Sequence, residues 1–194
     1  MKKNRSQEEY SLDIQVLLHP VVRNGNQFVL LAESFYPQYH TENYTDYDFY
    51  GRPYTNSYSI FDGYRFTSGI IAGFDRQGDL LWDNAMEIRN LLSFELTPKM
   101  NVFISDNEQI ICYLSDGKIG SKIFNGNTTL GKTEYSPVQL KTDNDRLLSE
   151  TKSRMIFWYD RYFLCYGFQE IKNLSREGEN KRLVYYFTKI RIEN

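Results

Sequence analysis

The chain has 194 residues, which is enough for one substantial hydrophobic core or for two small domains. Its formal net charge is −2, so no chain-wide electrostatic attraction to nucleic acid is expected, and no run of 18 apolar residues predicts a membrane span. Aromatic residues make up 16% of the chain, with 16 Tyr and 13 Phe, and this favours strands over helices.

Apolar runs alternate with short turn signals along most of the chain, which is typical of an antiparallel all-β protein. The strands we expect cover residues 14–22, 27–35, 64–75, 79–83, 94–104, 109–114, 118–124, 136–141, 155–159, 162–171 and 183–192. The first of these is interrupted by His19-Pro20, because proline cannot donate to a strand ladder. Gly25, Gly78 and Gly117 mark three of the tight turns.

Four segments are less regular. Residues 84–92 fit either a short helix, with Asn84 as its cap, or another strand. Residues 146–152 are expected to form one or two helical turns, and residues 173–181 a charged hairpin loop. Residues 1–11 are polar and expected to be flexible, so that residues 12–194 form a single all-β domain.

A short sequence motif recurs at intervals of about 40 to 50 residues, as expected for stacked β-units. It consists of two large apolar residues, a small residue and a variable one. Its copies begin at Leu30, Ile70, Ile110 and Phe163.

One turn region has a more specific pattern. Residues 74–82, Phe-Asp-Arg-Gln-Gly-Asp-Leu-Leu-Trp, resemble the strand–turn–strand of blades in quinoprotein-like β-propellers. The resemblance implies β-propeller-like repeated sheets, as a partial or four-bladed propeller, and it implies nothing about chemistry. A two-sheet β-sandwich is the alternative, because many short strands with turn signals fit it equally well.

The residues that usually carry catalysis or bind cofactors are sparse. The two histidines, His19 and His40, lack a metal-ligand spacing or a nucleophile motif, and we expect structural roles for both. No Gly-rich phosphate loop occurs, so the sequence predicts no cofactor and no metal. Cys112 and Cys165 lie among large apolar residues and are expected to be buried free thiols rather than a disulfide.

Carboxylates suggest two weaker hypotheses. Glu33 and Asp75 end predicted strands, and a pair of acids flanked by aromatic rings is what a glycosidase uses. Asp46, Asp48 and Asp62 could contribute oxygen ligands to calcium, although the spacing of a known calcium loop is absent.

Residues 36–64 contain eight tyrosines between two predicted strands, and we interpret them as a Tyr-rich insertion forming a surface loop. Tyrosine offers a flat apolar ring and a hydroxyl group, which suits a protein partner or a glycan. The predicted binding residues are Tyr44, Tyr47, Tyr50, Tyr54, Tyr58 and Asp62. The opposing interpretation is that these rings only pack the loop onto the sheet.

The sequence therefore favours a non-catalytic β-repeat module that binds a protein partner or a glycan, or serves as a scaffold. A carbohydrate-active hydrolase with paired carboxylates is the alternative. The first residues carry the positive charge of a signal peptide but no apolar run follows them. We expect a cytoplasmic protein, or an extracytoplasmic one if the chain is a trimmed fragment.

Overall fold

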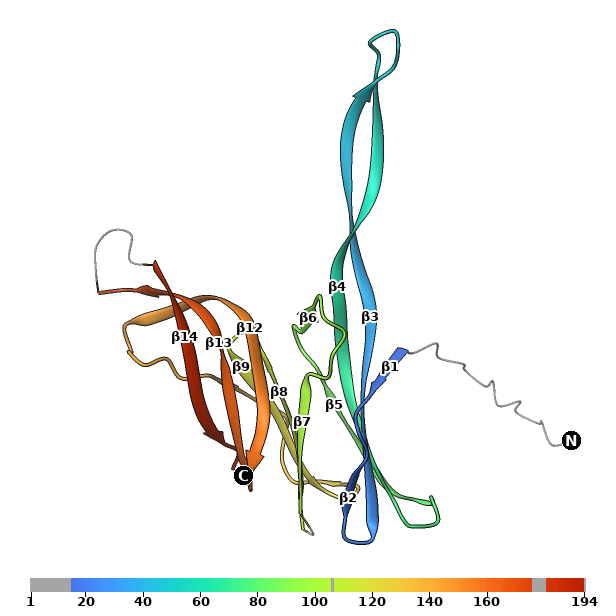
Figure 1. Cartoon of the computed structure of the whole chain (residues 1–194), viewed down its shortest axis with the longest axis vertical. Helices are drawn as coiled ribbons and strands as arrows, with labels where there is room; N and C mark the ends of the chain where they lie inside the picture. Colours follow the sequence, from blue (N-terminus) through green and yellow to red (C-terminus); the bar gives the residue numbers. More distant parts are fainter. Residues whose placement is uncertain (1–14, 106, 176–180, 194) are drawn as a thin grey trace, which may run out of the picture.

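The computed structural model describes residues 15–105, 107–175 and 181–193, so the predicted flexible segment 1–11 lies outside the described residues. The described chain forms three antiparallel sheets, none of which closes or curls into a barrel, and the all-β prediction is confirmed (Figure 1). Within these ranges no helix has the length and apolar character needed to cross a membrane.

Sheet A contains the first six strands and the longest hairpin of the molecule. Its main order is β1-β3-β4-β5, with β2 beside β3 and β6 beside β4. The strands are β1 (Gln15–Leu18), β2 (Val22–Asn24), β3 (Gln27–Tyr47), β4 (Pro53–Phe74), β5 (Leu80–Glu87) and β6 (Leu92–Ser93).

Sheets B and C contain the remaining strands in chain order. Sheet B has the order β10-β9-β8-β7, with β11 beside β9, and sheet C has the order β12-β13-β14. The strands of sheet B are β7 (Met100–Ile104), β8 (Gln109–Ser115), β9 (Lys118–Asn125), β10 (Thr128–Thr129) and β11 (Glu134–Pro137). Those of sheet C are β12 (Asp145–Tyr159), β13 (Tyr162–Asn173) and β14 (Lys181–Arg191).

Sheet B is the middle layer of the stack. Side chains of β8 alternate between two cores, because successive residues of a strand point to opposite faces. Ile111 and Tyr113 join the core shared with sheet A, whereas Ile110 and Cys112 join the core shared with sheet C. Residues 109–114 are all buried, which explains why this strand has a continuous apolar run rather than an alternating pattern.

Trp82 anchors the core between sheets A and B. Its ring lies over Gly73 of the neighbouring strand, where a Cβ atom would come within 2.3 Å of the indole. The indole nitrogen donates to Gln27 Oε1 at 3.1 Å, and the ring contacts Phe124 of sheet B at 6.1 Å between centroids. The turn that resembles a propeller blade therefore positions a buried ring, as its pattern suggests.

The prediction that the recurring apolar motif marks four stacked β-units is wrong. Leu31 and Ile71, from the first two copies, are register partners on adjacent strands of sheet A. Leu164, from the fourth copy, lies on the face of sheet C opposite to the buried Phe163 and Cys165. The motif marks strands in the middle of a sheet, and such strands are apolar wherever both faces are covered. No propeller closure occurs among the described strands.

Several predicted elements need correction. Residues 36–64 are not a loop: most of them belong to β3 and β4. Of the two alternatives for residues 84–92, the strand is confirmed for residues 84–87, which end β5, and residue 92 begins β6. Residues 146–152 belong to β12 rather than to a helix. Residues 94–99 lie outside any strand, and the predicted strand 94–104 begins only at Met100, two residues after Pro98, whose nitrogen has no hydrogen to donate. The predicted loop at 173–181 falls partly outside the described residues.

Truncating Trp82 tests the core between sheets A and B. We expect Trp82→Ala to lower the free energy of unfolding by about 3–5 kcal/mol, because it removes a buried ring and leaves a cavity. Leu81→Ala is the matched control, because Leu81 is its neighbour and is 45% exposed on the other face of β5. Chemical denaturation measures both variants; a near-neutral Trp82→Ala would contradict this packing.

Candidate functional site

The outer halves of β3 and β4 form a two-stranded arm that projects from the body (Figure 1). We define the arm as residues 39–61, whose pairing runs from Tyr39 opposite Phe61 to Tyr47 opposite Pro53. Strand β1 pairs no further out than Phe35, and β6 no further out than Tyr64, so both edges of the arm lie beyond the neighbouring strands. At the tip, Asp48 Oδ1 accepts the N–H groups of Tyr50 (2.9 Å) and Arg52 (2.8 Å).

The two faces of the arm differ in chemistry. One face is acidic and aromatic: Tyr58 donates to Glu42 at 2.8 Å, and Tyr54 donates to Asp46 at 3.1 Å. The ring of Tyr44 packs against that of Tyr58, with 5.8 Å between centroids. The other face carries small neutral pairs, which are Thr41 with Ser59, Asn43 with Ser57 and Thr45 with Thr55. The strict alternation of a strand produces this difference.

Charged contacts continue at the base of the arm. His40 bonds Asp62, and this hydrogen bond raises the pKa of the imidazole above its ordinary value of 6.5. The hydroxyl of Tyr58 lowers the pKa of Glu42, with a smaller contribution from His40. These contacts favour the ionised form of Glu42 on the acidic face.

The predicted binding tyrosines are all exposed, but they do not share one surface. Tyr44, Tyr54 and Tyr58 lie on the acidic face, Tyr47 lies on the neutral face, and Tyr50 lies at the tip. Asp62 lies at the base, bonded to His40. Sequence reasoning missed Phe49 at the tip, which is 98% exposed and packs edge-on against Tyr50. Its position in an Asp-Phe-Tyr-Gly turn between alternating segments was the available signal.

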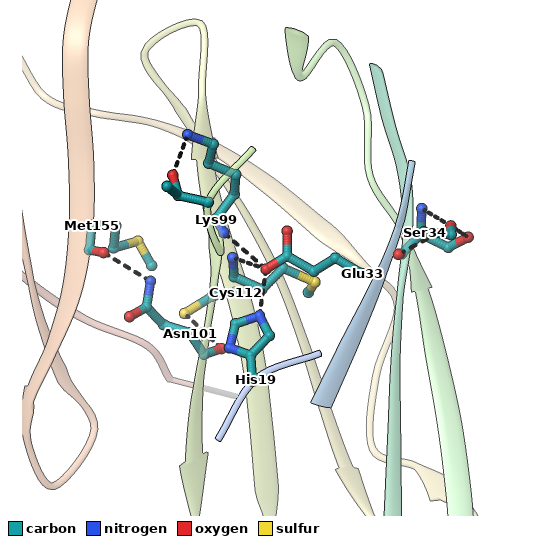
Figure 2. A network of polar contacts seen from close by, with 10 residues as sticks. His19, Glu33, Ser34, Lys99, Asn101, Cys112 and Met155 are labelled. Carbon is teal, nitrogen blue, oxygen red and sulfur yellow. Dashed lines mark hydrogen bonds and ion pairs between the residues drawn. The ribbon is translucent and has the colours of Figure 1, made fainter. Parts of the chain in front are cut away.

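A buried carboxylate ties sheet A to sheet B below the arm (Figure 2). Glu33 is fully buried, and its Oε1 accepts hydrogen bonds from His19 Nε2 (2.5 Å) and from the backbone N–H groups of Lys99 and Met100 (2.8 Å each). These two N–H groups precede and begin β7, the edge strand of sheet B. The interaction therefore fixes how the two sheets meet, and His19 has the hydrogen-bonded structural role predicted for it.

A second tie connects sheet B to sheet C through the next residue of β7 (Figure 2). The Asn101 side chain donates to the carbonyl oxygen of Met155 at 2.9 Å and accepts the N–H of Phe157 at 3.1 Å. The side-chain amide of Asn101 thus makes the same two kinds of hydrogen bond to β12 that the backbone of a neighbouring strand would make. Residues 99–101 therefore connect all three layers.

The carboxylates considered for catalysis are not brought together. Glu33 is opposite Gly69 on β4, and Asp75 lies six residues further along, about 20 Å away at the usual rise of a strand. Asp75 accepts the N–H groups of Gln77 and Asp79 within its turn. A glycosidase needs its two carboxylates within about 10 Å.

The metal and thiol candidates also receive structural contacts. On the arm, Asp46 and Asp48 bond Tyr54 and Arg52, and the described residues contain no cluster of three side chains suited to a metal ion. Cys112 and Cys165 are both free and buried in the core between sheets B and C, as predicted. Burial raises the pKa of both thiols, to about 12 for Cys165, which makes them unreactive.

An open groove of about 1090 Å³ lies beside the base of the arm. The segment from Leu92 to Lys99 forms one side, and β12 from Glu150 to Ile156 forms the other. Its charged side chains are of both signs, and the Arg154–Glu95 ion pair at 3.2 Å spans it. This mixed, solvent-open lining contrasts with the uniform chemistry of the arm.

Comparisons with protein-family models, curated proteins and solved structures found no match to this chain. The functional argument therefore rests on the surfaces of this molecule. Among these surfaces, the arm carries the largest group of exposed aromatic side chains, and no sheet packs against the arm.

Removing the buried carboxylate tests the tie between sheets A and B. We expect Glu33→Ala to lower the free energy of unfolding by about 3–5 kcal/mol, because it leaves His19 and two buried N–H groups without their acceptor. Glu87→Ala on the same sheet removes an exposed carboxylate and should cost at most about 1 kcal/mol. Equal effects in urea denaturation would contradict a structural role for Glu33.

Proposed function

We propose that this protein is a non-catalytic β module that binds a protein surface through its arm. The observation that carries the proposal is the exposure of seven large aromatic side chains on a ribbon with no core of its own. They are Tyr39, Tyr44, Tyr47, Phe49, Tyr50, Tyr54 and Tyr58. Isolated two-stranded hairpins are marginally stable in water, so holding these rings in solvent has a cost that binding would offset.

The shape of the arm supports a protein rather than a glycan as its partner. A sugar-binding platform needs several rings on one flat or concave side, whereas these rings are divided between two faces and a tip. The arm projects from the body, and its two strand edges, which lie beyond β1 and β6, have backbone groups free to pair with another chain. A protein surface can use the rings and the edges together.

The three stacked sheets would then act as the scaffold that holds the arm. We include a propeller-like assembly in this proposal, because sheets A, B and C pack face to face as neighbouring blades do. Closure of a ring would need further sheets from other chains. The ties at Glu33 and Asn101 would keep the base of the arm rigid relative to the stack.

The triple variant Tyr47→Ala, Tyr50→Ala and Tyr54→Ala tests the proposal. We expect the free energy of unfolding to change by less than about 1 kcal/mol, because the three rings contact little of the body. A photo-reactive residue at Phe49 should form an adduct with a partner protein, and the triple variant should lose that adduct.

A photo-reactive residue at Gln77, in the exposed turn between β4 and β5, is the matched control for non-specific labelling. A large loss of stability in the triple variant would support packing of the rings instead. Labelling at Phe49 no greater than at Gln77 would also count against a binding arm.

A further inference from the structure

The outer face of sheet C combines exposed apolar rings with an excess of positive charge, although one carboxylate, Glu170, also lies on it, two residues from Lys172 on β13. Phe168, Tyr185 and Phe187 lie on this face, with exposed fractions of 37%, 60% and 64%. The rings of Phe168 and Tyr185 meet edge to face, with 5.3 Å between centroids. The opposite face of the same sheet fills the core against sheet B, and no sheet formed by the described residues covers the outer face.

A row of three cations crosses one end of this face. Arg146, Lys172 and Lys181 are register partners on β12, β13 and β14, so their side chains point the same way from neighbouring strands. Like charges directly opposite one another destabilise a sheet. Among the described residues, none of the three forms an ion pair.

A fourth cation lies at the other end of the face. Lys189 is eight residues from Lys181 on β14 and lies 3.9 Å from the centre of the Tyr162 ring. Eight residues of strand span about 27 Å. The exposed rings of Tyr185 and Phe187 lie between the two positive ends. Along its length this surface carries the row of three cations, then Glu170, then the aromatic rings, and finally Lys189.

The acidic face of the arm carries an excess of the opposite charge, although His40 also lies on it, bonded to Asp62. Asp62 lies at its base and Asp46 near its tip, where Asp46 is opposite Tyr54. Asp62 and Tyr54 are eight residues apart on β4, so the acids span about the same 27 Å. Tyr44 and Tyr58 lie between them, together with Glu42. Residues 39–62 contain four carboxylates, one arginine, no lysine and one histidine, His40.

We propose that the arm of one copy of this chain lies across the outer face of sheet C of a second copy. The inference rests on the proposed binding role of the arm and names its partner. The arm projects along the long axis, away from the sheet C of its own chain, so the contact forms between molecules (Figure 1). If two copies exchange arms reciprocally the assembly closes as a dimer, and one-way docking extends it.

Charge reversal on each surface tests this contact by sedimentation velocity over a range of protein concentrations. We expect the wild-type chain to self-associate, with weaker association at higher salt. Lys172→Glu with Lys181→Glu, or Glu42→Lys with Asp46→Lys, should each lower the association constant by about tenfold or more. The chain carrying all four substitutions should regain association, because both surfaces have then changed sign.

Lys132→Glu with Lys141→Glu is the matched control, since it makes the same charge change at exposed positions away from this face. It should leave association unchanged, and circular dichroism checks that each variant keeps its sheet content. A wild-type chain that stays monomeric would overturn the inference. So would association that the arm variant does not weaken, or a sheet C face that binds a single-stranded oligonucleotide in place of a second copy.

These failures differ from a failure of the proposed function. A monomeric chain that still forms a Phe49 adduct with another protein would keep the binding arm and exclude only the second copy as its partner. A chain whose self-association does not depend on the arm, and which forms no more adduct at Phe49 than at Gln77, would overturn both.

Discussion

Burial of sheet B on both of its faces is the constraint on which the rest of the structure depends. Strand β8 sends Ile111 and Tyr113 into one core and Ile110 and Cys112 into the other, so neither core can form without this strand. Apolar burial of this kind is the main favourable term in folding. Sheets A and C each bury one face against sheet B, and no further sheet among the described residues covers their other faces.

The polar ties explain how three sheets stack with a defined register. Apolar contacts are not directional, whereas a hydrogen bond with a buried partner is costly to break. Glu33 fixes the start of β7 to sheet A, and Asn101 fixes the same strand to β12. The base of the arm is consequently held by the layer structure, while the arm itself, beyond the last neighbouring strands, depends only on pairing between its own two strands.

Local sequence patterns predicted strands and turns correctly where neighbouring residues alone determine the backbone conformation. Gly25, Gly78 and Gly117 adopt positive φ in the turns expected of them, and Trp82 is buried as its turn pattern implies. Tertiary relations were not accessible in this way. The recurring apolar motif indicates a strand that is buried on both faces. It therefore occurs on adjacent strands of one sheet, such as those of Leu31 and Ile71, and its copies do not correspond to separate structural units. The arm was misread because Tyr, Ser, Thr and Asn alternate there without an apolar face, so the usual strand pattern is missing.

The candidate site was predicted in composition but not in geometry. Tyrosine density identified the segment, yet only strand pairing separates Tyr44 and Tyr58 on the acidic face from Tyr47 on the other. Glu33 shows the converse limit: its place at a strand end suggested one of a pair of catalytic acids, whereas long-range contacts bury it against residues 99 and 100.

Amide hydrogen exchange, resolved by segment, tests the layered organisation most directly. The amides of β8 should exchange slowest, at rates about a thousandfold or more below those of the arm, because β8 opens only when both cores are lost. Exchange in β8 as fast as in the arm would contradict a middle sheet held from both sides.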